Sequence, residues 1–321
     1  MIGDCPLRTA RRLALAAAAL LAADPALALN CALKEGVTPE QAAAGLCGFD
    51  VATRHFAGTP AEQAACLTRK VSPGGVIGAP TLTGFLRALM GHEPDITRGR
   101  VADYVRALGI DVDKALGGDP MTPVTADYFI IHDTSTPNCS EPGWSKTLCP
   151  APGELPKARD SAAWAAELGF LGHPKPAPDR LAHAWTDRIG GSITEVTFDL
   201  PLRSTKFESC LDTPAKAGLF LAVENTEPRV ADPALGRPND RVAPKPGFTR
   251  AQYDRLALLY IAASVRRGGW LIPAFHAVLD ARFADGHDDP QNFSMSAFSR
   301  AVERHLRQLK GRRDWASDTR F

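Results

Sequence analysis

The sequence has 321 residues, with 37 basic and 36 acidic side chains and an isoelectric point of about 7.7. A chain of this length buries most of its apolar surface and folds as one large domain or two smaller ones. The near balance of charge argues against a nucleic acid or an anionic membrane surface as its partner.

Residues 1–28 have the features of a secretory signal peptide. Basic residues, ending with the pair Arg11 and Arg12, precede the apolar run "LALAAAALLAA", which is too short to cross a bilayer as a helix. The small residues of "ALA" at 26–28 allow cleavage after Ala28. We therefore expect an exported protein, periplasmic or extracellular, with no stable membrane insertion once the signal peptide is removed.

Removal of the signal peptide would leave six cysteines: Cys31, Cys47, Cys66, Cys139, Cys149 and Cys210. In an oxidising compartment an even number of cysteines predicts disulfides, and the lack of a CxxC pair argues against a thiolate metal site. Cys139 and Cys149 flank a loop that contains proline and glycine, and we expect them to pair. Three cysteines precede residue 70 and three follow residue 130. If all six are paired, at least one disulfide joins the two regions.

Residues 29–118 are predicted to form a mostly helical accessory region. The stretches "TPEQAAAGL" and "TPAEQAACL" each place Thr-Pro before a helix-forming run, which is typical of a helix start. The stretch "ITRGRVADYVRALG" repeats apolar residues at helical spacing. The Gly-Gly-Asp sequence at 117–119 ends this region.

Residues 119–321 interleave strands and helices, which predicts an α/β fold. The apolar run in 126–138 predicts a strand that ends at His132, and 139–180 predicts a long loop with one helix at 160–172. Residues 181–201 read as a hairpin around Gly190-Gly191, and 217–228 as a buried strand that ends near Glu224. A helix is predicted over 248–269, followed by an acidic loop at 275–293 and an amphipathic helix at 294–311.

Several polar residues stand at the ends of these predicted elements, where side chains from distant parts of the sequence can meet. They are His132, Glu224, His276, His287 and Asp289. Two imidazoles and a carboxylate are ligands that suit Zn²⁺ and leave a fourth position for water.

The stretches "YFIIHDTSTPN", "LAHAWTDRIGGSITEV", "LFLAVENTEP", "FTRAQYDRLALL" and "FHAVLDARFADGHDDPQNF" follow one another in the order of one domain pattern. They resemble the zinc-dependent N-acetylmuramoyl-L-alanine amidases, which share their fold with the peptidoglycan recognition proteins. The resemblance covers about residues 124–310. It implies that 119–321 form a zinc domain with a central mixed β-sheet flanked by helices, and it leaves 29–118 unexplained.

Carried over to this sequence, the resemblance makes His132, His276 and Asp289 the zinc ligands. Glu224 matches the glutamate that activates water. His287 stands where many members of the family have a lysine beside the reacting carbonyl. Glu224 has a structural alternative, an ion pair with Arg229.

Two parts of this assignment leave alternatives open. The interval from His276 to the third ligand is longer than usual, so Asp288, and less readily Asp285, compete with Asp289. His183 lies in the hairpin pattern and is expected to face the substrate, with structural packing as the alternative.

The implied activity is hydrolysis of the amide bond between N-acetylmuramic acid and L-alanine of the stem peptide by zinc-activated water, with peptidoglycan or muropeptide fragments as substrate. A recognition protein of the same fold, which binds muropeptide without cleaving it, is the alternative from another class. A peptidase that acts within the stem peptide is a third. The oligomeric state is left open.

Overall fold

In a computed structural model of the protein, the described residues are 31–139, 182–210, 218–229, 242–243 and 247–311. The expected signal peptide and the helix expected at 160–172 lie outside them. Within the described ranges, no helix is long and apolar enough to cross a membrane.

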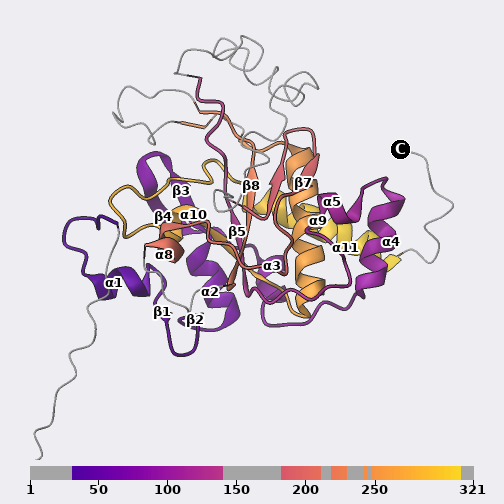
Figure 1. The fold of residues 1–321 in the computed structure, drawn as a ribbon, viewed down its shortest axis with the longest axis horizontal. Helices are drawn as coiled ribbons and strands as arrows, with labels where there is room; N and C mark the ends of the chain where they lie inside the picture. The colour runs from indigo at the N-terminus through magenta and orange to yellow at the C-terminus, as the bar shows by residue number, and fades with distance from the viewer. Residues whose placement is uncertain (1–30, 140–181, 211–217, 230–241, 244–246, 312–321) are drawn as a thin grey trace, which may run out of the picture.

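A five-stranded mixed sheet with strand order β7-β6-β8-β5-β9 forms the centre of the fold (Figure 1). Its strands are β5 (Tyr128–Ile131), β6 (Ala184–Thr186), β7 (Ser192–Thr194), β8 (Phe220–Asn225) and β9 (Ile272–Phe275). β6, β8, β5 and β9 run parallel, and β7 pairs antiparallel with β6 at the edge. Every residue of β5 and β9 is buried, because helices and loops cover both faces of this parallel part. The predicted α/β fold with a central mixed sheet flanked by helices is confirmed.

Helices α9 (Arg250–Arg267) and α11 (Met295–Gly311) pack together on one side of the sheet (Figure 1). α9 begins where the sequence predicts, because Thr249 and Gln252 form a capping box there. It ends at Gly268, which has a φ of 79°, a conformation that glycine adopts without a steric penalty. The ring of Tyr260 on α9 contacts the ring of Phe129 on β5 at 5.4 Å between centroids.

The region before residue 119 contains more than the predicted helices. Its helices are α1 (Pro39–Ala44), α2 (Pro60–Leu67), α3 (Gly84–Leu89), α4 (Arg98–Ala107) and α5 (Val112–Ala115). Two small hairpins, which the sequence did not predict, pair β1 (Phe49–Asp50) with β2 (His55–Phe56) and β3 (Arg69–Ser72) with β4 (Val76–Pro80). A 3₁₀ turn at Pro73–Gly75 joins the second pair. The hairpins are too short to show an alternating pattern in the sequence.

This N-terminal region shares one hydrophobic core with the sheet. The ring of Phe56 lies 5.2 Å from that of Tyr128 on β5 and 6.4 Å from that of Phe220 on β8. The Phe56 amide also donates a hydrogen bond to the Tyr128 hydroxyl at 3.1 Å. α2 packs against β9. The expected accessory region therefore covers the face of the sheet that carries Tyr128 and Phe220.

Two disulfides have both of their cysteines among the described residues. Cys47–Cys66 lies within the N-terminal region, and Cys31–Cys210 connects that region to the end of α8 (Lys206–Ser209). A disulfide between the two regions was expected if all six cysteines are paired, and Cys31–Cys210 is such a disulfide. Cys139 is also disulfide-bonded, but its expected partner Cys149 lies outside the described residues.

We predict that the two disulfides contribute unequally to stability. Cys31–Cys210 closes a separation of 179 residues and Cys47–Cys66 one of 19. Loop-closure entropy costs about 0.6 kcal/mol for each doubling of loop length, so removing the longer cross-link should cost about 2 kcal/mol more. The free energies of unfolding of the two double Cys→Ala variants in denaturant measure this difference. Equal losses, or a larger loss without Cys47–Cys66, would contradict the entropic account.

Candidate metal centre

Three adjacent parallel strands bring the first polar residues of the site together. Ile131, the last residue of β5, is in register with residues of both β8 and β9. The next residues along these three strands are His132, Glu224 and His276. Because side chains alternate along a strand, all three project from the same face of the sheet as Tyr128. This is the face that the N-terminal region covers.

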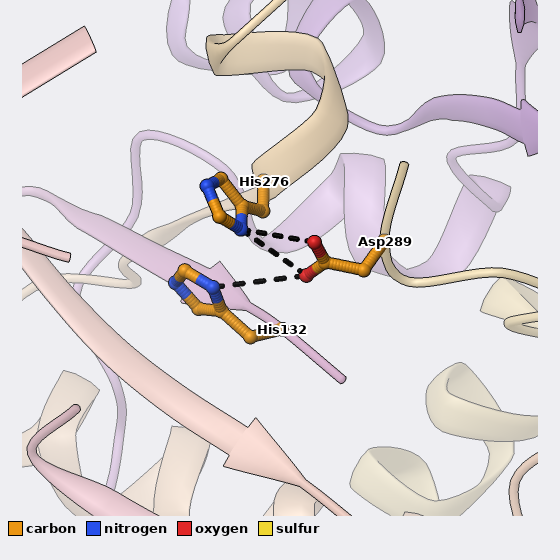
Figure 2. A group of neighbouring side chains, drawn as sticks. All are labelled: His132, His276 and Asp289. Carbon is orange, nitrogen blue, oxygen red and sulfur yellow. Dashed lines mark hydrogen bonds and ion pairs between the residues drawn. The ribbon is translucent and has the colours of Figure 1, made fainter. Parts of the chain in front are cut away.

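Asp289 completes the group from the loop that follows α10 (His276–Leu279), as Figure 2 shows. Its Oδ1 lies 3.0 Å from Nδ1 of His276, and its Oδ2 lies 3.7 Å from Nδ1 of His132. Each of the three side chains is at most 5% exposed. The backbone amide of Asp133 donates to Asp289 Oδ2 at 3.1 Å, and the Asp289 carbonyl accepts from the amide of Ala277 at 2.8 Å. Asp289 is therefore held through both its carboxylate and its backbone.

This group of His132, His276 and Asp289 can hold a metal ion, since one ligand atom from each lies within 4.8 Å of the others. Tetrahedral zinc with bonds of about 2.0–2.1 Å places neighbouring ligand atoms about 3.3 Å apart. Oδ2 of Asp289 lies 3.3 Å from Nδ1 of His276 and 3.7 Å from Nδ1 of His132, both close to that value. Two imidazole nitrogens and a carboxylate oxygen are also the donor types that zinc prefers. The residues present thus fit the metal that the sequence suggested.

Glu224 lies beside this group. Its Oε1 is 3.7 Å from Nδ1 of His132. Its Oε2 is buried and has no hydrogen-bond partner within the described part of the chain. A buried carboxylate oxygen without a partner is costly, so its position next to the ligand group suggests a chemical role for Glu224.

Burial and neighbouring charges shift the pKa values of all four groups. Burial and the imidazole of His276 lower the pKa of His132 well below its ordinary value. Burial and the charge of Asp289 raise the pKa of Glu224 well above its ordinary value. Burial alone would raise the pKa of Asp289 and lower that of His276, but their mutual attraction reverses both shifts. His276 and Asp289 thus form a buried ion pair, while His132 is neutral, the form in which imidazole binds metals.

The other two acids considered for the third ligand lie elsewhere. Asp288 Oδ2 accepts from the amide of Gly74 at 3.1 Å and from Nε2 of Gln291 at 2.8 Å. Burial raises the pKa of Asp288 to about 6. Asp285 is exposed and forms an ion pair with Lys206 on α8. Among the three acids, Asp289 is the one that the structure brings to His132 and His276.

His287 lies at the solvent side of the ligand group. Its ring centroid is 4.7 Å from that of His276, and its Nδ1 is 3.7 Å from Asp289 Oδ1. Half of its side chain is exposed. It is therefore close enough to the ligands to contact a substrate bound there.

His183 does not join the group. It is 1% exposed, its Nδ1 accepts from the amide of Ala222 at 3.1 Å, and its Nε2 lies 3.0 Å from the carbonyl of Leu200. Burial lowers its pKa to about 4, so it is neutral. With both ring nitrogens bonded to the backbone, His183 has the surroundings of a structural residue, which was the alternative to the expected contact with substrate.

Sequence reasoning missed the buried residues that support the ligands. Arg229, considered as a partner of Glu224, instead pairs with Asp133 at 2.6 Å. Asp133 Oδ2 also accepts from the amide of Gln291 at 3.0 Å. Asp133 directly follows His132, and Gln291 lies two residues after Asp289. The positions of Asp133 and Gln291 close to ligands in the sequence could have marked them as supporting residues. Only the fold shows that Asp133 accepts a bond from the Gln291 amide.

Comparisons with known proteins give little further information. No protein family model matches the chain. No curated protein sequence matches it significantly. Among solved structures, the crystal structure of a selenomethionine derivative of AmpD aligns with 59% of this chain and 90% of its own, with 17% sequence identity and a TM-score of 0.28. A similarity at this level supports no argument about function.

We predict that the protein binds one zinc ion and that Asp289, not Asp288, contributes to the site. Asp289→Asn removes the only anionic ligand of the group and should weaken zinc binding by more than about 100-fold, the upper end of what loss of an outer partner causes. Asp288→Asn is the matched control, because its remaining oxygen can still accept the bonds from Gly74 and Gln291. Competition with a chromophoric chelator measures both affinities. Equal losses in the two variants, or a larger loss in Asp288→Asn, would contradict the assignment.

Proposed function

We propose that this protein is a zinc-dependent amidase that hydrolyses the bond between N-acetylmuramic acid and L-alanine of the stem peptide. The observation that carries the proposal is the convergence of His132, Glu224, His276 and Asp289. These residues come from three separate stretches of the sequence, with His276 and Asp289 in the same one, and each stretch resembles the part of the amidase pattern that supplies the corresponding residues. Their meeting at the carboxyl ends of β5, β8 and β9 supports the resemblance.

The proposed reaction divides the chemistry between the metal and the protein. Bound zinc would polarise the scissile carbonyl and make water nucleophilic near neutral pH. Glu224 would accept the proton of the attacking water as a general base. It would then donate that proton to the nitrogen of the departing L-alanine as a general acid.

His287 would stabilise the negative charge that develops on the carbonyl oxygen. Its half-exposed side chain beside His276 and Asp289 can reach a substrate without displacing a ligand. In its protonated form the imidazole would donate a hydrogen bond and carry a positive charge, as the lysine of many family members would.

We further propose that the protein acts outside the cytoplasm on peptidoglycan or on muropeptides released from it. The disulfides Cys31–Cys210 and Cys47–Cys66 are typical of proteins from an oxidising compartment and support export. The predicted signal peptide supports it from the sequence.

Glu224→Gln should separate zinc binding from catalysis. Loss of the general base should slow hydrolysis by about 10²–10⁴-fold, while zinc binding remains because the three ligands are intact. Mass spectrometry of muropeptide digests measures release of the stem peptide, and Glu303→Gln on α11, where the half-exposed side chain pairs with Arg307, is the control. If zinc-loaded wild-type protein binds muropeptide tightly and releases no peptide, the chain is a recognition protein and the proposed activity is wrong.

His287→Ala should slow hydrolysis and leave zinc binding intact. His287 lies beside His276 and Asp289 but is not one of the three ligands, so its loss removes a donor to the carbonyl oxygen and no metal ligand. We expect kcat to fall by about 10²–10³-fold, the usual effect of losing one such donor. Rates of muropeptide cleavage and zinc affinities of the two proteins test this. An unchanged kcat would remove His287 from the proposed mechanism.

A further inference from the structure

The imidazole of His276 is held at both nitrogens, and only one of them faces the other ligands. Nδ1 lies beside Asp289, whereas Nε2 lies 2.8 Å from Oδ2 of Asp280. Asp280 is one turn further along the chain, and its amide bonds to the His276 carbonyl at 3.0 Å. Its side chain is fully buried. A buried carboxylate thus lies on the side of the ring that faces away from the proposed metal.

The carboxylate of Asp280 has further partners on α8. Its Oδ1 accepts from the amide of Phe207 at 3.0 Å, and its Oδ2 accepts from the amide of Lys206 at 3.3 Å. Together with His276 Nε2, three N–H groups therefore converge on two carboxylate oxygens. A carboxylate satisfies all three because it only accepts hydrogen bonds.

α8 is a rigid support for these bonds. The Phe207 side chain is fully buried, with its ring 5.6 Å from that of Phe49, 5.7 Å from that of Phe56 and 6.2 Å from that of Phe220. The residue after α8, Cys210, is cross-linked to Cys31. The position of Asp280 is thus fixed by the core and by a disulfide, and the His276 ring is oriented against it.

We propose that Asp280 is a positioning residue that selects Nδ1 of His276 as the metal ligand. By accepting a hydrogen bond from Nε2, its carboxylate keeps the proton on that nitrogen and leaves the Nδ1 lone pair free for the metal. The inference rests on the proposed metal centre but not on the substrate or the reaction. The two histidines differ in this respect: Nε2 of His276 has a carboxylate partner, whereas Nε2 of His132 has no hydrogen-bond partner within the described ranges.

The selection requires that both side-chain oxygens of Asp280 accept hydrogen bonds. An asparagine side chain has one oxygen and one NH₂ group, so it cannot accept hydrogen bonds at both positions. If its oxygen keeps the bond from Phe207, its NH₂ faces His276 and favours the tautomer with the proton on Nδ1. That proton would occupy the nitrogen that the metal needs.

Zinc affinity and the tautomer of His276 test the proposal without reference to activity. We expect Asp280→Asn to bind zinc about 10–100-fold more weakly than wild type, the usual effect of losing an outer partner of a ligand. In ¹⁵N-edited histidine spectra of the zinc-loaded protein, wild type should show His276 with its proton on Nε2. In the variant, the signal of this tautomer should be weaker or absent. Asp103→Asn, an exposed change on α4, should alter neither measurement. Thermal unfolding of the metal-free variants checks that they fold.

Unchanged zinc affinity together with an unchanged His276 signal in folded Asp280→Asn would overturn the proposal.

If that variant does not fold, Lys206→Pro replaces it, with Lys206→Ala as its matched control. Proline is tolerated at the first position of α8, where the preceding Thr205 is extended. Both variants lose the Lys206 side chain and its contacts with Asp285, so Lys206→Pro differs from Lys206→Ala in lacking the N–H that bonds Asp280. Weaker zinc binding in Lys206→Pro than in Lys206→Ala supports the proposal, and equal binding refutes it. A wild-type protein that binds zinc but cleaves no muropeptide would refute the proposed reaction alone.

Discussion

The buried carboxylate of Asp289 is the constraint on which the rest of this site depends. A carboxylate removed from water is stable only if positive charge or hydrogen-bond donors replace its hydration. Here the imidazole of His276, the amide of Asp133 and the nearby ring of His132 take that place. The same arrangement brings two imidazole nitrogens and a carboxylate together, so the contacts that compensate the buried charge also form a group that can hold a metal ion.

The supports of Asp289 come from parts of the chain that are far apart in the sequence. Asp133, next to the first ligand, bonds the amide of Gln291 beside the third ligand and pairs with the buried Arg229. From the N-terminal region, the Gly74 amide bonds Asp288 in the same loop. This region therefore takes part in holding the ligand loop, which gives a structural role to residues that the family resemblance does not cover.

The sequence predicted what local patterns encode and missed what depends on tertiary pairing. The start of α9 at Thr249 and its end at Gly268 were predictable, because capping residues act within a few positions. The ends of the strands at His132 and Glu224 were predictable from apolar runs. The register that puts these residues level with His276 was not, since it depends on strand order. The choice of Asp289 over Asp288, and the contacts of Asp280 and Arg229, also required the fold.

The coordination of zinc in the wild-type protein tests this account most directly. X-ray absorption at the zinc edge of the protein loaded with one zinc ion per chain reports the type and distance of the ligand atoms. We predict a four-coordinate site with only nitrogen and oxygen ligands, at about 2.0–2.2 Å, and scattering typical of two imidazoles. Sulfur at about 2.3 Å, a shell of six oxygens without imidazole, or no stoichiometric zinc would contradict the central claim that His132, His276 and Asp289 form a metal centre.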